Sequence, residues 1–173
     1  MSGSQSQVLY TPEQRARRDA TRWTLVQGIL APVQFFVFLL SLYLVVNSLK
    51  TGENTDWALI SVVVKTVVLY AIMITGAIWE KVVFGKYLFA PAFFWEDVVS
   101  TLVMVLHTAY LWVWWEGKWS ADDQLLLALT AYTTYAINAA QYIRKLRMAR
   151  LQRPAEPSRD LEHTTASGPQ VSL

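Results

Sequence analysis

The stretch that decides the fold reads WALISVVVKTVVLYAIMITGAIW and runs from Trp57 to Trp79. It carries a single charged residue, Lys65, and it is long enough to cross a hydrocarbon core of about 30 Å, for which a helix needs roughly 20 residues. Because the run is continuously apolar, it does not show the alternation over about ten residues that is typical of strands in a membrane β-barrel. The stretch therefore predicts a transmembrane helix.

Three further apolar runs of similar length surround it, from Trp23 to Ser48, from about Trp95 to Trp115 and from about Gln124 to Ile143. With 54% hydrophobic and only 16% charged residues, the chain is unlike a soluble domain of its length. The first run is far longer than the apolar region of a signal peptide, so we expect it to be retained. Together the runs predict an all-α polytopic membrane protein with four transmembrane helices.

Basic residues gather in an amino-terminal arm (1–22), in a loop (80–95) and in the segment 144–173, whereas the other two loops hold only Lys50 and Lys118. The positive-inside rule therefore places both termini and the loop 80–95 on the cytoplasmic side of the membrane, with 23–143 as the transmembrane domain. Because topology and anionic lipid headgroups account for the basic residues, no nucleic-acid partner is expected. From Pro154 onward the polar segment, rich in Pro and Ser, predicts a disordered tail.

The chain has no cysteine, which excludes disulfides, thiolate metal sites and iron–sulfur clusters. His163 lies in the polar tail, so His107 is the only histidine in the predicted spans. One chain therefore cannot hold a haem between two histidines. We expect no cofactor and no metal held by the protein alone.

Three carboxylates, Glu80, Glu96 and Asp97, lie in the segment WEKVVFGKYLFAPAFFWED between the second and third apolar runs, residues 79–97. Carboxylates at the edge of hydrocarbon are costly to keep charged, so they pair, titrate or take part in proton chemistry. Ordinary interfacial salt bridges with Lys81 and Lys86 are the simpler interpretation. Three acids around one apolar segment that contains Pro91 favour a site.

Glu96, Ser100, Val103 and His107 recur at a helical spacing, so Glu96 and His107 lie within about 20° of one helix face. Glu80 ends the second predicted helix where Glu96 begins the third, so these two acids can approach each other. Two carboxylates close together in a poorly solvated place cannot both ionise easily, and one is expected to stay protonated. We expect Glu96 to act as the acid and Glu80 or Asp97 as the base.

Lys65 and His107 fall at a similar depth in the second and third runs, where a charge without a partner costs about 3 kcal/mol or more. Lys65 either ties helices together by hydrogen bonding or binds a substrate. His107 either donates a hydrogen bond across a helix interface, relays protons or ligates a metallated macrocycle. Polar side chains in the same membrane half predict a polar pocket: Gln27, Gln34, Asn138 and Gln141.

Several segments resemble the vinyl hydratase family of bacteriochlorophyll biosynthesis: Leu9–Arg15, Trp23–Gly28, Val62–Thr66, Thr75–Gly85, Tyr87–Asp97 and His107–Tyr110. The likeness covers roughly residues 9–150. It implies addition of water to the 3-vinyl group of chlorophyllide a or 3-vinyl bacteriochlorophyllide, giving a 3-(1-hydroxyethyl) product. It also implies other enzymes of pigment biosynthesis as partners, beside the lipid bilayer. No site residue is taken from the family.

Hydration of an alkene needs an acid, a base and one water, and each such proton-transfer assist is worth about 10² to 10⁴ in rate. Aromatic side chains could stack on a flat pigment: Trp79, Phe93, Phe94 and Trp95. Lys65 and Asn138 are candidate substrate contacts, and His107 could ligate the magnesium of the substrate. Two other functions remain open, namely a non-catalytic tetrapyrrole-binding or assembly protein and a small proton-coupled transporter.

Overall fold

The computed structural model describes residues 9–151, and the regular structure in this part of the chain is helical. Five helices follow one another: α1 (Pro12–Ala20), α2 (Arg22–Thr51), α3 (Thr55–Phe84), α4 (Phe94–Glu116) and α5 (Ala121–Leu151). Each of the four predicted spans lies within one of the long helices α2 to α5. The predictions about the tail from Pro154 onward, and about Arg153, Arg159 and His163, fall outside the described residues.

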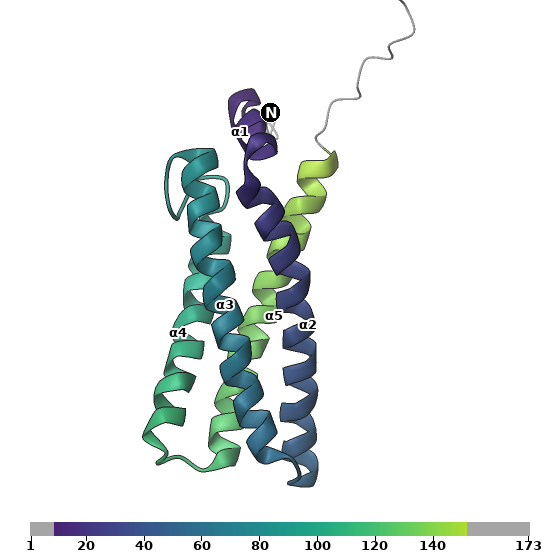
Figure 1. Cartoon of the computed structure of the whole chain (residues 1–173), viewed down its shortest axis with the longest axis vertical. Coiled ribbons are helices and arrows are strands. Elements are labelled where there is room, and N and C mark those ends of the chain that lie inside the picture. The colour runs from purple at the N-terminus through teal and green to yellow at the C-terminus, as the bar shows by residue number, and fades with distance from the viewer. Residues whose placement is uncertain (1–8, 152–173) are drawn as a thin grey trace, which may run out of the picture.

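The four long helices lie alongside one another in a bundle, with the short α1 at one end (Figure 1). The helix α2 packs chiefly on α3, and α4 packs chiefly on α5. The α3–α4 connection, α1 and the end of α5 share one end of the bundle, whereas the α2–α3 and α4–α5 connections lie at the other. The candidate carboxylates are therefore at the same end as the start of α2 and the end of α5.

Helices α2, α3 and α4 are long and apolar enough to cross a membrane, which makes this a membrane protein. Their burial pattern fits a lipid environment, because large apolar side chains such as Phe36 and Ile74 are exposed while polar ones such as Ser41 and Lys65 are buried. The helix α5 is equally long, but Thr, Tyr, Asn and Gln residues make its central part less apolar. The fourth predicted span thus lies in a helix, but this helix is less apolar than the helices of the other three spans.

The α3–α4 connection covers residues 85–93, so the ends of the predicted loop 80–95 are helical. The helix α3 continues to Phe84 and ends where Gly85 takes the left-handed conformation, with a φ of 82°. Glu80 consequently sits in the last turns of α3, while Glu96 and Asp97 sit in the first turn of α4. A helix holds each of the three carboxylates, which fixes their directions more firmly than a loop could.

Candidate active site at the α3–α4 connection

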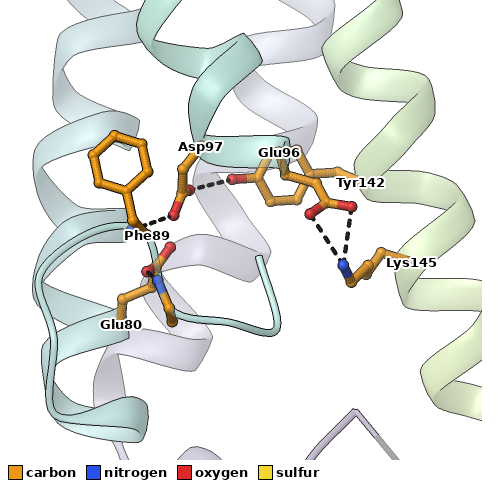
Figure 2. Close-up of polar contacts among 7 residues, drawn as sticks. Glu80, Phe89, Glu96, Asp97, Tyr142 and Lys145 are labelled. Carbon is orange, nitrogen blue, oxygen red and sulfur yellow. Dashed lines mark hydrogen bonds and ion pairs between the residues drawn. The ribbon is translucent and has the colours of Figure 1, made fainter. Parts of the chain in front are cut away.

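Glu80 and Asp97 form a pair of buried carboxyl groups, with 5% and 2% of each residue exposed. Their side chains point toward each other (Figure 2). Two carboxyl groups that face each other in a buried place cannot both ionise easily, so a proton on one of them is favoured. This arrangement favours one proton shared by the two acids.

Backbone amides of the connection close over this pair. The Phe89 N–H donates to Asp97 Oδ2 at 2.7 Å, and the Ala90 N–H donates to Glu80 Oε2 at 3.4 Å. Phe89 has a φ of 59°, which is an outlier for a bulky side chain and persists only where surrounding contacts impose it. The bond to Asp97 is such a contact, so the shape of the connection and the position of the carboxyl pair depend on each other.

The helix α5 supplies two partners that the sequence analysis missed. The Tyr142 hydroxyl donates to Asp97 Oδ1 at 3.5 Å, and the Lys145 ammonium contacts both oxygens of Glu96 at 3.0 and 3.1 Å (Figure 2). Tyr142 and Lys145 follow Asn138 at helical spacing, so extending the face that carries Asn138 would have found them. The site thus takes groups from three helices.

The expected approach of Glu80 to Glu96 is not what the structure shows, because Asp97 faces Glu80 instead. Successive residues of a helix point about 100° apart, so α4 turns Asp97 toward α3 and Glu96 toward α5. The interfacial salt bridges with Lys81 or Lys86 are also absent among the described residues. Lys81 donates to the Gly85 carbonyl at 3.0 Å. As predicted for one helix face, Glu96 and His107 are both buried.

The four aromatic candidates divide into two groups. Phe93 is buried at 3% exposure and packs with Trp79, Tyr10, Phe84 and Tyr142 in a second core cluster. Phe94 and Trp95 are exposed, at 44% and 70%, with their rings in a T-shaped contact. Phe89, which the sequence analysis did not select, is 41% exposed and packs on Phe94. Trp79 and Phe93 are thus packed inside the protein, whereas Phe94 and Trp95, together with Phe89, form an exposed aromatic surface at the connection and the start of α4.

Lys65 and His107 meet in the middle of the bundle, so the lysine ties two helices together by hydrogen bonding, one of the two predicted roles. The Lys65 ammonium lies 2.9 Å from His107 Nε2, and His107 Nδ1 lies 2.8 Å from the Val103 carbonyl. Both residues are fully buried, and the Lys65 amine lies 4.0 Å from the centre of the Tyr135 ring. Both ring nitrogens of His107 are engaged, so neither is free for the magnesium of a pigment.

The four amides from which a polar pocket was predicted lie among the helices of the bundle. Gln27 on α2 donates to the Thr75 hydroxyl on α3 at 2.7 Å. Asn138 on α5 donates from Nδ2 to Ser100 Oγ on α4 at 2.8 Å. Gln34 and Gln141 have amide atoms that are buried without a hydrogen-bond partner among the described residues. These amides lie inward from the carboxyl pair.

Comparison with known proteins places this chain in a family. A family model described as 2-vinyl bacteriochlorophyllide hydratase matches residues 10–148. A curated relative of that name from Rhodobacter capsulatus is 62% identical over 149 residues, which cover 86% of this chain and 86% of the relative. Another of that name from Cereibacter sphaeroides is 65% identical over 147 residues, covering 85% of this chain and 91% of the relative. No solved structure matches the chain. The chain therefore belongs to the 2-vinyl bacteriochlorophyllide hydratase family, a family of hydro-lyases.

Proposed function

We propose that this protein adds water to the 3-vinyl group of chlorophyllide a or 3-vinyl bacteriochlorophyllide, giving the 3-(1-hydroxyethyl) product; the family name counts the same vinyl group as 2. Family membership supports the reaction class. The observation that carries the chemistry is the buried Glu80–Asp97 pair next to an exposed aromatic surface. Alkene hydration requires a proton held beside a surface that can receive the flat apolar pigment.

The reaction needs one proton given and one proton taken. The carboxyl pair protonates the terminal vinyl carbon, and the positive charge that forms on the inner carbon is delocalised into the conjugated macrocycle. Water then attacks the inner carbon, and its proton returns to the carboxylate of the pair. General acid and base assistance of this kind contributes about 10² to 10⁴ each in rate. The pair ends the cycle with the proton it began with.

We assign the acid and base roles to Glu80 and Asp97 jointly. Glu96 anchors the start of α4 to α5 through its ion pair with Lys145. Both carboxylate oxygens of Glu96 accept hydrogen bonds from Lys145, so Glu96 would have to leave this ion pair to reach a substrate. The sequence alone favoured Glu96 as the acid because of its helix face. The contacts favour the pair, since Asp97 Oδ2 and Glu80 Oε2 are held by backbone amides at the connection.

For the pigment we propose a seat on the exposed aromatic surface formed by Phe89, Phe94 and Trp95, which offers flat faces to a macrocycle. Phe93 and Trp79 support this seat from within, because they are packed in the second core cluster. Lys65 and His107 lie outside the proposed seat, since they are fully buried and bonded to each other. An amphipathic pigment would reach the seat from the membrane boundary.

The proposed orientation has four spans in a bacterial cytoplasmic membrane, with both termini and the carboxyl pair on the cytoplasmic side. The clustering of basic residues supports it, and so does the position of α1, the α3–α4 connection and the end of α5 at one end of the bundle (Figure 1). Reporter fusions after Lys86 and Arg150 should give a cytoplasmic signal, and fusions after Ser48 and Lys118 an external one. A cytoplasmic signal at Lys118 would overturn the four-span arrangement.

Expression in a host that lacks the pathway tests the function itself. Membranes that contain the protein should convert added chlorophyllide a into a product heavier by one water, and membranes without it should not. Pigment binding is measured in the same samples. Binding without any hydrated product would favour a non-catalytic pigment carrier. Neither binding nor product would contradict the proposal.

A further inference from the structure

Gln34 is a buried amide that the bundle itself does not satisfy. It is 2% exposed on α2, yet neither its Oε1 nor its Nε2 has a hydrogen-bond partner among the described residues. Buried side-chain polar atoms almost always have a partner, because leaving them unpaired forfeits their hydration. A glutamine with both amide atoms unpaired therefore indicates a small polar ligand between the helices.

Two amides of α5 stand at or near the same level. Phe38 lies one turn after Gln34 on α2, and its ring contacts Tyr135 of α5 at 4.8 Å between centroids. The two helices run in opposite directions (Figure 1), so Asn138, one turn after Tyr135, comes level with Gln34. Asn138 Oδ1 and Gln141 Oε1 are likewise buried without a partner. The unpaired atoms thus come from α2 and α5 at a similar depth in the bundle.

This group of amides is connected to the carboxyl pair. Asn138 donates to Ser100 Oγ at 2.8 Å, and Ser100 lies one turn inward from Asp97 on α4. Tyr142, one turn after Asn138, is hydrogen-bonded to Asp97. The unpaired amides are therefore about one helical turn inward from the proposed source of the proton.

The chemistry of the unpaired atoms limits what the ligand can be. The four unpaired atoms are one amide nitrogen, of Gln34, and three amide oxygens, of Gln34, Asn138 and Gln141. Amide oxygens accept hydrogen bonds. The ligand must therefore donate, whereas carbonyl oxygens on a pigment can only accept. Water donates twice and accepts twice, and it fits among packed helices where a larger donor would not.

We propose that Gln34 and Asn138, with Gln141, form a water-binding site that holds the water used in hydration. This inference rests on the proposed function. When the terminal vinyl carbon takes the proton of the Glu80–Asp97 pair, the oxygen of this water forms the new C–O bond to the inner carbon. One of its hydrogens returns to the pair as a proton, and the other stays on the new hydroxyl group. The amides position the water and do not themselves transfer protons.

The test uses Gln34→Leu in the full-length protein in nanodiscs. This change keeps the side-chain size but removes both unpaired atoms, so thermal stability should stay equal or rise. The kcat for hydration should fall about 10- to 100-fold because the water is no longer positioned. The Kd for the vinyl pigment should not change. Ser41→Ala is the matched control on the same helix, because it removes hydrogen bonds to Tyr132 and Ser61 and should lower stability but not kcat.

Unchanged kcat in Gln34→Leu would overturn the water site. A loss explained entirely by a higher pigment Kd would overturn it as well, because the amide would then bind the pigment. Footprinting by X-ray radiolysis in ¹⁸O-labelled water gives a readout that does not depend on activity. Tyr142 should be labelled in the wild type and less so in Gln34→Leu, and an unlabelled Tyr142 in the wild type would contradict the site. Failure of the wild type to hydrate any vinyl pigment would instead count against the proposed function.

Discussion

Two buried polar clusters of this bundle differ in how many of their polar groups have a hydrogen-bond or ion-pair partner. At mid-bundle, Lys65 and His107 satisfy each other, and the second ring nitrogen of His107 contacts a backbone carbonyl. At the α3–α4 connection three carboxylates are buried, and among the described residues only Glu96 has an ion-pair partner, Lys145. The first cluster is closed on all sides, whereas the second lies beside exposed aromatic rings.

The comparison shows how a polar group in a membrane bundle serves structure or chemistry. A matched donor and acceptor at mid-membrane holds helices together and leaves nothing free for a substrate. Two acids that face each other leave a proton in place and an acceptor for its return. The proposed active site is therefore the group of buried acids at the α3–α4 connection and not the buried Lys65 at mid-bundle.

The largest effect should follow from Asp97→Asn, which leaves the pair unable to give and retake a proton. We expect kcat for hydration to fall by about 10² to 10⁴, with pigment binding retained. Glu80→Gln should behave alike. Asp123→Asn is the matched control, because Asp123 is an exposed acid at the other end of the bundle, bonded to Ser120. Near-normal turnover in both Asp97→Asn and Glu80→Gln would remove the pair from the mechanism.

A smaller effect is expected from Glu96→Gln, which breaks the ion pair with Lys145 without touching the carboxyl pair. Loss of this anchor should shift the start of α4 and reduce kcat about 10- to 100-fold, because misplacement of catalytic groups by about 1 Å is costly. Lys145→Met should produce a similar loss. Lys118→Met, which breaks the exposed contact with Glu116, serves as the control. If Glu96→Gln lost as much activity as Asp97→Asn, Glu96 would itself be the acid.

The aromatic seat should affect binding more than chemistry. Trp95→Ala removes a ring that is 70% exposed beside the carboxyl pair, and Trp115→Ala removes one that is 83% exposed at the other end of α4. A stacking contact is worth about 0.5–1.5 kcal/mol, so Trp95→Ala should raise the pigment Kd about two- to tenfold. Fluorescence titration in nanodiscs measures both variants. Equal changes in the two would place the pigment elsewhere.

The smallest effect on hydration should come from the mid-bundle pair. His107→Leu leaves the buried Lys65 amine without its partner, so the free energy of unfolding should fall by about 1–3 kcal/mol. Turnover of the folded protein should stay within about threefold, and binding of the magnesium pigment and its demetallated analogue should change alike. Selective loss of binding for the magnesium pigment would instead identify His107 as its ligand.

The apolar runs were enough to predict the long helices, because burial in hydrocarbon leaves a continuous signal of about 20 residues. Equal depth of Lys65 and His107 followed from helical rise alone. Their direct contact could not be predicted, since it depends on how α3 and α4 are rotated about their axes. Tyr142, by contrast, lies one helical turn beyond Asn138 on α5, so helical spacing alone places it near Asn138.

The acid that faces Glu80 could not be chosen from the sequence. Glu96 and Asp97 are adjacent, and only the course of the connection decides which of them turns toward α3. That course includes Phe89 in a left-handed conformation, which no rule for phenylalanine predicts. Backbone amides then hold the chosen acid, and such contacts carry no sequence signal.

Infrared spectroscopy tests most directly whether Glu80 and Asp97 share one proton. A protonated carboxyl group gives a carbonyl stretch that is separate from carboxylate bands and shifts in D₂O. We predict this band at neutral pH in the wild-type protein in nanodiscs, and its loss in both Glu80→Gln and Asp97→Asn. A wild-type spectrum without the band, or a band that survives unchanged in both variants, would contradict the shared proton.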